Sequence, residues 1–133
     1  MNIYLDIDGV LLANNRQAAN YVDEFLAYMT SKFDCYWLTT HCWRGENRAI
    51  EVLSPYLKAE TIALLGKVKP TDWGEMKTDA IDFSQPFIWF DDDLWPEEQK
   101  ALEKSNTLKS FKMIDLMKDP NQLKEFIGNN SLQ

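Results

Sequence analysis

Short apolar segments recur along this chain, and polar or amphipathic stretches separate them. Five of these segments have the length and composition of β-strands: Ile3 to Ile7, Cys35 to Thr39, roughly Thr61 to Leu65, Pro86 to Phe90, and Ser110 to Leu116. The segment from Pro86 to Phe90 is apolar throughout, which is typical of a strand covered on both faces. Thr61 to Leu65 also fits the continuation of the helix expected before it.

Between the strands lie stretches with the three-and-four spacing of amphipathic helices. In the first of them the apolar positions are Val22, Phe25, Leu26, Met29 and Phe33. Asn14 and Gln17 are placed like a capping box ahead of this helix. Further helices are expected from Trp43 to Ser54, from Asp72 to Phe83, from Pro96 onward, and from Asp119 to Gly128. Strands that alternate with helices predict an α/β fold, here a three-layer α/β/α sandwich around a central, parallel, five-stranded Rossmann-like sheet.

The length and charge of the chain narrow the possibilities further. Its 133 residues predict a single domain spanning 1–133, and a hydrophobic content of 45% is enough for a packed core. The 14 Lys and Arg against 21 Asp and Glu give a net charge of -7. Such a surface repels long phosphate backbones, so we expect nucleic acid as a partner only through a phosphorylated end. The oligomeric state stays open.

The sequence predicts a cytoplasmic protein. No apolar run approaches the length of a membrane helix, and the first residues lack a basic region followed by an apolar stretch. The two cysteines are Cys35, in a predicted strand, and Cys42, just beyond its end. We therefore expect reduced thiols and neither a disulfide framework nor a metal site built from cysteine.

Polar side chains gather at the ends of three predicted strands. They are Asp6 and Asp8 after the first strand, Thr39, Thr40 and His41 at the second, and Asp91, Asp92 and Asp93 after the fourth. Carboxyl ends of parallel strands meet at one edge of a sheet, where such folds bind ligands. Carboxylates gathered there need a compensating cation, and oxygen ligands suit a hard ion, of which Mg²⁺ is expected.

A lysine completes this set. Along the predicted helix from Asp72 to Phe83, the stripe containing Trp73 and Ile81 is apolar except for Lys77. A long stem with a charged tip can run along a core face and reach the acidic edge. Lys69 is the alternative, although it precedes Pro70 in an extended segment and is therefore less fixed.

These features together resemble the haloacid dehalogenase-like superfamily. Its four motifs match in order: DIDGV from Asp6, an apolar strand ending in Thr39, Lys77 before the fourth strand, and a strand ending in DDD. The resemblance covers the chain from Ile3 to about Asp93. The stretches WLTTH and FIWFDDD are further similar to small phosphatase-like members associated with nucleic-acid repair and nucleotide metabolism.

The resemblance implies a Mg²⁺-dependent phosphatase, a phosphoric monoester hydrolase that works through an aspartyl-phosphate. Asp6 would be the nucleophile, and Asp8 would first protonate the leaving oxygen and then deprotonate water. Thr39 and Lys77 would hold the phosphate oxygens on which charge accumulates. Asp8 also favours phosphoryl transfer, because dehalogenating members lack an acid at that position.

The resemblance also implies a set of metal ligands. Mg²⁺ would bind the Asp6 carboxylate, the Asp8 carbonyl and Asp92. Asp91 would position Lys77 or a metal-bound water, and the roles of Asp91 and Asp92 are interchangeable at this stage.

Substrate size follows from the spacing of the motifs. The intervals from Asp8 to Thr39 and from Thr39 to Lys77 are too short for a cap domain. An open site predicts a large phosphorylated substrate, a nucleic-acid or nucleotide phosphate, or a partner subunit that closes the site. Thr40, His41 and Arg44 are the candidate substrate-binding residues, with Arg44 and Arg48 one turn apart on the helix expected from Trp43. The alternative function is a weakly active or inactive module that binds Mg²⁺ and a phosphorylated partner.

Overall fold

A parallel four-stranded sheet forms the centre of the molecule. The computed structural model describes residues 1–128, so residues 129–133 of the predicted single domain lie outside the described residues. The strands are β1 (Asn2–Leu5), β2 (Asp34–Trp37), β3 (Phe87–Asp91) and β4 (Phe111–Met113). They are ordered β2-β1-β3-β4, and every neighbouring pair is parallel. The chain therefore leaves β2 on one side of β1 and returns as β3 on the other side, which makes the carboxyl ends of β1 and β3 a topological switch point.

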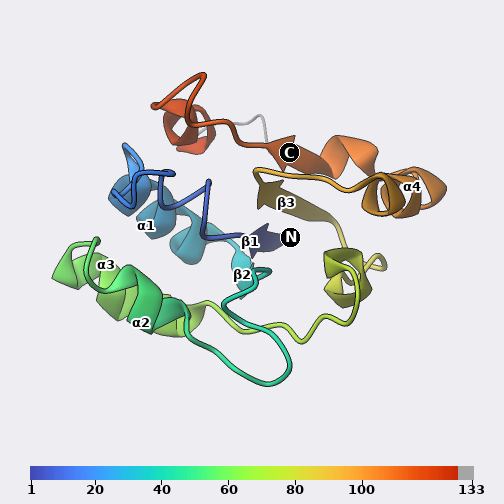
Figure 1. The fold of residues 1–133 in the computed structure, drawn as a ribbon, viewed down its shortest axis with the longest axis horizontal. Helices are drawn as coiled ribbons and strands as arrows, with labels where there is room; N and C mark the ends of the chain where they lie inside the picture. The colour runs from blue at the N-terminus through green and yellow to red at the C-terminus, as the bar shows by residue number, and fades with distance from the viewer. Residues whose placement is uncertain (129–133) are drawn as a thin grey trace.

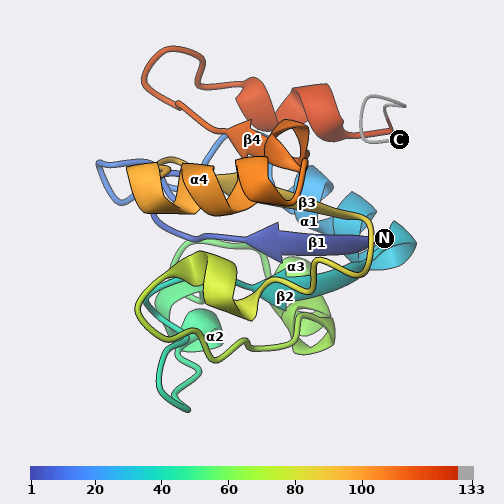
Figure 2. The same cartoon turned by 90° about the vertical axis from the view of Figure 1, so that its right-hand side faces the viewer.

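Helices lie on both faces of this sheet (Figures 1 and 2). The helices α1 (Val22–Lys32), α2 (Ala49–Leu53) and α3 (Ala59–Leu64) cover one face, and α4 (Pro96–Lys104) covers the other. Side chains alternate along each strand, so the two faces have separate cores. Ile3, Leu5 and Phe90 pack in the cluster on the α1 face, whereas Tyr4 and Trp89 pack in the cluster on the α4 face. The predicted α/β fold with a parallel sheet is confirmed.

Four of the five predicted strands are present, with ends shifted by one to three residues. The strand expected at Thr61 to Leu65 is wrong, because most of this segment belongs to α3. The hydroxyl of Thr61 donates to the carboxylate of Asp23 on α1, and the N–H of Lys58 donates to the same oxygen at 3.3 Å. A short apolar run fits a strand or a helix equally, and these contacts with α1 decide for the helix.

An extended segment lies along the free edge of β2. The N–H of Trp37 donates to the carbonyl of Lys69 at 2.7 Å, and the N–H of Lys69 donates to Cys35 at 2.9 Å. This forms an isolated parallel bridge between Tyr36 and Lys69 in place of a full fifth strand. The next residues continue along β2, since the Thr71 hydroxyl donates to the Trp37 carbonyl.

The helices predicted at Val22 and at Pro96 are present, the one expected from Trp43 begins only at Ala49, and two others are reduced to 3₁₀ turns. Residues 43–48 form a loop in which Arg44 and Gly45 have positive φ angles of 52° and 84°, so Arg44 and Arg48 do not share a helix. Only Lys77–Ala80 of the helix expected at Asp72 to Phe83 is helical, as a 3₁₀ turn. The last expected helix is a 3₁₀ turn over Gln122–Phe126. Before Lys77, the hydrogen bonds of the Thr71 and Trp73 side chains to the carbonyls of Trp37 and Thr39 outweigh local helical spacing.

The beginning of α1 also differs from the prediction. Asn14 and Gln17 lie in a loop and not at the helix start, where Tyr21 occupies the N-cap position with φ 66°. Within that loop the side chain of Asn15 accepts the N–H of Gln17 at 3.2 Å. An Asx-type turn has therefore taken the place of the expected capping box.

Both cysteines are buried free thiols, as predicted. Burial raises the pKa of Cys35 to about 12, so this thiol stays protonated at neutral pH. In the part of the chain that the structure describes, no helix combines the length and apolar character needed to span a membrane.

Candidate active site

Asp6 follows β1 directly and leads into a tight turn. Its own N–H still pairs with the carbonyl of Phe90 at 3.1 Å, and its Oδ1 accepts the N–H of Ile7 at 2.8 Å. The carbonyl of Ile7 then accepts the N–H groups of residues 10, 11 and 12. This turn needs Gly9, whose φ is +82°. The side chain of Asp6 is consequently fixed at the edge of the sheet while Asp8 projects beyond it.

Asp91 ends the neighbouring strand β3 and is 2% exposed. Its Oδ1 accepts the N–H of Asp92 at 2.8 Å and that of Asp93 at 3.3 Å. These two bonds turn the chain away from the sheet and leave the second oxygen, Oδ2, facing the edge that β1 and β3 share. One oxygen of Asp91 is thus held by backbone N–H groups, and the other is available to bind a cation.

Lys77 joins the two strand ends. Its Nζ lies 2.8 Å from Asp91 Oδ2 and 3.4 Å from Asp6 Oδ2, and its side chain is 14% exposed. The expected approach along a helix face is replaced by approach from a 3₁₀ turn on the α4 side of the sheet. Lys69, the alternative lysine, is exposed on the far edge of β2.

Glu98 holds this lysine turn in place. The carboxylate of Glu98 is 3% exposed. Its Oε2 accepts the N–H of Lys77 at 3.2 Å, and its Oε1 accepts the N–H of Trp95 at 3.0 Å, where α4 begins. The sequence Pro96-Glu97-Glu98 signals a helix start, but nothing in it signals the second bond. Glu98 is therefore a positioning residue that sequence reasoning missed.

The charges at this edge do not balance within the protein. The pKa of Lys77 is raised, since the carboxylates of Asp6 and Asp91 outweigh the effect of burial, which favours the neutral amine. Burial and then the negative charge of Asp6 raise the pKa of Asp91 to about 9, against the opposing effect of Lys77. Burial also raises the pKa of Asp92, although a hydrogen bond with Asp91 opposes the shift. One ammonium is not enough for three neighbouring carboxyl groups, so a proton or a further cation is required.

The same three carboxyl groups have the geometry of a cation site. Asp6, Asp91 and Asp92 each offer an oxygen within 4.8 Å of the others. A Cβ on Gly9 would lie 2.2 Å from Asp92 Oδ2, so the absence of a side chain there allows Asp92 to approach the turn after β1. Three carboxylate oxygens at one rim suit a hard divalent ion, and this donor set does not by itself distinguish Mg²⁺ from other such ions.

Thr39 follows the end of β2, the strand that pairs with β1. Leu5 is in register with Trp37, and the N–H of Leu38 donates to the carbonyl of Leu5 at 2.8 Å, so Thr39 lies one position further along its strand than Asp6 does. Thr39 is 1% exposed, its carbonyl accepts the indole N–H of Trp73 at 3.1 Å, and its hydroxyl accepts the N–H of His41 at 3.4 Å. This residue is the best fixed of the polar group at the end of β2.

The remaining candidates are more exposed. Asp8 Oδ2 lies 2.8 Å from His41 Nε2, in a pair whose side chains are 57% and 21% exposed. Thr40 is exposed, and Arg44 is exposed with its guanidinium 4.3 Å from the ring centroid of Trp43. Hence the structure brings together Asp6, Lys77, Asp91 and Asp92, pairs Asp8 with His41 near the surface, and leaves Thr40 and Arg44 exposed.

Comparisons of the chain with protein-family models, with curated proteins and with solved structures found no match. The chemistry of the site therefore has to be argued from its own residues.

Proposed function

We propose that the protein is a Mg²⁺-dependent phosphatase of the haloacid dehalogenase-like type, which hydrolyses a phosphoric monoester through an aspartyl-phosphate on Asp6. The observation that carries this proposal is Lys77 Nζ at 2.8 Å from Asp91 and 3.4 Å from Asp6, with Asp92 completing an acidic group at the same rim. A nucleophilic carboxylate needs an adjacent cation in order to approach an anionic phosphoryl group, and this rim offers Lys77 together with ligands for a second cation.

The first chemical step is attack by an Asp6 carboxylate oxygen on phosphorus. The bond between phosphorus and the ester oxygen breaks, and that oxygen takes a proton from Asp8. Asp8 suits this role because its side chain projects from the turn that follows Asp6 and is 57% exposed, within reach of a substrate above the rim. His41 orients the carboxyl group of Asp8 through its 2.8 Å contact. Positioned acid-base help of this kind contributes roughly 10²–10⁴-fold.

The second step releases phosphate. Asp8 takes a proton from water, the water oxygen attacks phosphorus, and the bond to Asp6 breaks. Lys77 and the Thr39 hydroxyl hold the phosphoryl oxygens, on which negative charge accumulates in both steps. Glu98 keeps Lys77 at this position through the backbone N–H of that residue. Asp6, Asp92 and the Asp8 carbonyl would hold Mg²⁺, with Asp91 as a further candidate ligand, and the ion would neutralise charge between nucleophile and phosphate.

The proposal includes a site without a cap domain. Within the described residues, α1 is the α-helix between Asp8 and Thr39, and it packs on the sheet. The helices α2 and α3 follow Thr39 and lie on that same face (Figure 1). A phosphorylated group can therefore approach the rim from solvent.

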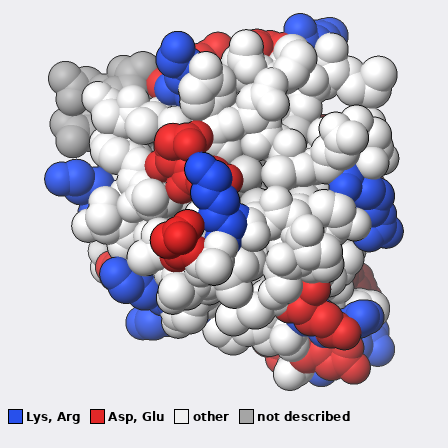
Figure 3. Space-filling view, turned by 90° about the vertical axis from the view of Figure 1, so that its left-hand side faces the viewer, with Lys and Arg blue, Asp and Glu red and all other residues white. Residues whose placement is uncertain are grey.

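The surface argues against an extended nucleic acid as partner. On the face that carries α1, the lysines and arginines are separated by uncharged areas or interleaved with acids (Figure 3). With a net charge of -7, such a surface offers a phosphate backbone no continuous basic path. Nucleic acid remains in the proposal only as a phosphorylated end.

The deciding experiment is phosphate release from an aryl phosphate with and without Mg²⁺. We expect Mg²⁺-dependent turnover, and a loss of roughly 10³-fold or more in Asp6→Asn, because the nucleophile is removed. Equal activity of Asp6→Asn and the wild type refutes the nucleophile assignment. Binding of a phosphate mimic without any turnover supports the alternative, a module that binds a metal and a phosphorylated partner.

A further inference from the structure

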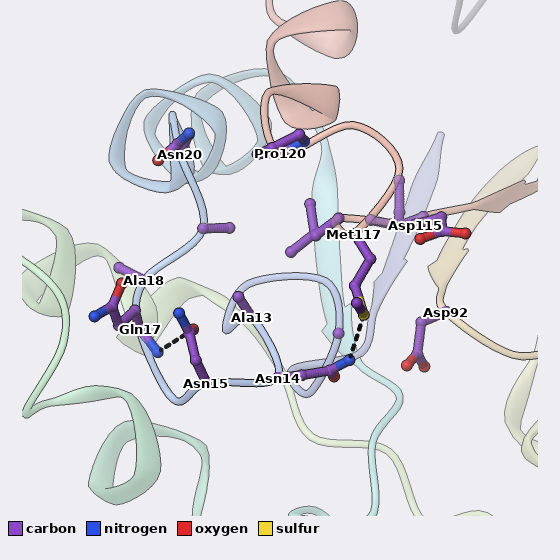
Figure 4. Close-up of a pocket in the computed structure, with 14 residues that line it drawn as sticks. Ala13, Asn14, Asn15, Gln17, Ala18, Asn20, Asp92, Asp115, Met117 and Pro120 are labelled. Atoms are coloured by element: carbon purple, nitrogen blue, oxygen red, sulfur yellow. Dashed lines mark hydrogen bonds between the residues drawn. The ribbon is translucent and has the colours of Figure 1, made fainter.

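A pocket of about 560 Å³ opens next to the candidate active site (Figure 4). Gly9 and Asp92 line it, so it continues from the rim where Asp92 meets the turn after β1. Its remaining walls come from residues 13–20, which follow that turn, and from residues 114–120, which follow β4. The volume lies within the range of about 300–1,000 Å³ that small-molecule sites occupy.

Two side-chain contacts join the walls of this pocket. Asn20 Nδ2 donates to Asn121 Oδ1 at 2.9 Å, and Asn14 Nδ2 donates to Met117 Sδ at 3.5 Å. The second contact crosses from one segment to the other beside Asp92 (Figure 4). The base of the first segment is held as well, because the N–H of Ala19 donates to the carbonyl of Leu11 at 2.9 Å. The pocket is therefore a built feature, made of two segments about 100 positions apart in the sequence.

The chemistry of the walls is selective. Polar groups are contributed by the side chains of Asn14, Asn15, Gln17, Asn20, Asp92 and Asp115. Amides donate and accept hydrogen bonds, and carboxylates accept them, which matches the donor and acceptor pattern of alcohol groups.

The groups that the walls lack are equally informative. Among the described residues that line the pocket, none is a lysine, an arginine, a histidine or an aromatic residue. Asp92 is assigned to the metal, so a second phosphate in the pocket would meet the carboxylate of Asp115 with no cationic side chain in the lining, which is unfavourable. A nucleobase would find no ring on which to stack. Arg16 and Lys118 belong to the same two segments but do not line the pocket.

We propose that this pocket binds the organic part of the substrate, and that this part is an uncharged, hydroxyl-rich group: a sugar that carries a single phosphate. The inference rests on the proposed function, because the phosphate is the group held at Asp6, Lys77 and the metal ligands. The pocket would enclose a small substrate although the site has no cap domain. Residues 13–20 and 114–120 would thus surround the substrate from the side of the site.

Binding is tested by NMR on the wild-type protein with Mg²⁺, using the hydrolysis-resistant phosphonate of a hexose monophosphate. We expect the side-chain amide signals of Asn14, Asn15 and Gln17 to shift. Methylphosphonate, which lacks the sugar, should shift backbone signals of residues 6–9 and 91–93 and leave those amides unchanged. Shifts confined to the rim with both compounds overturn the pocket assignment.

A kinetic experiment tests the same pocket by filling it. Ala13 lines the pocket, and Ala13→Phe should lower the ratio of kcat/KM for a hexose monophosphate to kcat/KM for acetyl phosphate at least tenfold. The matched control is Ala63→Phe on the exposed side of α3, which should leave both values unchanged. Should Ala13→Phe fail to fold, Gln17→Ala is the second variant, with an expected three- to tenfold fall in the ratio. An unchanged ratio in a folded pocket variant overturns the proposal.

The substrate class is tested with wild-type protein and a panel. Hexose monophosphates should exceed nucleoside 5′-monophosphates and sugar bisphosphates at least tenfold in kcat/KM. A preference for either of the others overturns the sugar assignment. If acetyl phosphate is hydrolysed but the pocket amides do not respond, the pocket proposal fails alone. If no phosphate ester or acyl phosphate is hydrolysed, the proposed function fails and the substrate assignment fails with it.

Discussion

The two halves of the candidate site differ in how they are held. The buried ion cluster, which consists of Asp6, Lys77 and Asp91, lies at the ends of β1 and β3 with each side chain no more than 14% exposed. The second half, here called the outer group, consists of Asp8, Thr40, His41 and Arg44. In its Asp8–His41 pair the side chain of Asp8 is 57% exposed. Charges in the cluster interact through the protein interior, which screens them poorly, whereas water screens the charges of the outer group.

This difference separates two kinds of role. In the cluster, the positions of the charged atoms are set by the fold before any substrate arrives, so a change there alters stability, ion binding and chemistry together. In the outer group, the side chains are more exposed, so a change there should cost little stability. A change at Thr40 or Arg44 should alter substrate binding, and a change at Asp8 or His41 should alter the acid-base help. Variants that affect both regions alike would contradict this division.

The largest effect on stability is expected from Lys77→Met. Removing the ammonium leaves two buried carboxyl groups without their partner, which costs about 3–5 kcal/mol of the free energy of unfolding at pH 8. Phosphatase activity should fall by roughly 10²–10³-fold, since a group that stabilises transition-state charge is lost.

Lys69→Met is the matched control for this variant. Lys69 was the other lysine compatible with the sequence, and it is exposed at the edge of β2. Its substitution should change stability by less than about 0.5 kcal/mol. Chemical denaturation and phosphate release measure both quantities. Similar losses in the two variants would place the essential lysine outside the cluster.

The second effect concerns pH and metal binding. Asp91 has a pKa of about 9 in the folded protein, far above the ordinary value near 4, so the folded state keeps a proton that the unfolded state has lost. Without a divalent ion, stability should therefore fall as the pH rises from about 4 towards 9. Mg²⁺ competes with that proton, so its affinity should rise with pH over the same range, by up to about tenfold per unit.

Thermal unfolding with and without Mg²⁺ at pH 6 and pH 8.5 measures this linkage. The stabilisation by Mg²⁺ should be clearly larger at pH 8.5. In Asp91→Asn, which has no proton to lose, the stabilisation should no longer depend on pH in this way. A wild-type response that is equal at both pH values would exclude Asp91 from the cation site.

A smaller effect is expected from Gly9→Ala, which joins the cluster to the turn. The new Cβ would lie 2.2 Å from Asp92 Oδ2, and the φ of +82° is strained for alanine. Gly45→Ala is a close control, because Gly45 has φ +84° and nothing within 4 Å of the added atom. Both variants should lose about 1–2 kcal/mol from the backbone alone. Only Gly9→Ala should also weaken Mg²⁺ binding, as followed by calorimetry, and equal Mg²⁺ affinities would show that Asp92 is not a ligand.

The smallest effect on stability and activity is expected in the outer group, from Arg44→Ala. Its guanidinium contacts the ring of Trp43 on an exposed loop, so the free energy of unfolding should change by less than about 0.5 kcal/mol. If Arg44 binds substrate, as the sequence predicts, KM should rise severalfold while kcat stays nearly constant. A fall in kcat with KM unchanged would move Arg44 from substrate binding into the chemical step.

Much of the fold was predictable because burial leaves a strong pattern. The apolar strands that end before Asp6 and in Asp91 are recognisable on their own, and so is α1 with its three-and-four spacing. The segment at 59–65 was not predictable, because its apolar run fits either structure and contacts with Asp23 decide between them. The segment before Lys77 has helical spacing, yet the side chains of Thr71 and Trp73 donate to backbone carbonyls at and just beyond the end of β2.

What the sequence determined by itself was which residue types stand at the ends of strands, since that follows from local order along the chain. Asp6, Thr39 and Asp91 are recognisable for that reason. Only the tertiary structure decided which groups meet: Lys77 in preference to Lys69, Glu98 beneath it, and a pocket between two segments distant in sequence. These ion pairs and pocket walls depend on the distances between residues that are far apart in the sequence. The order of residues along the chain does not specify those distances.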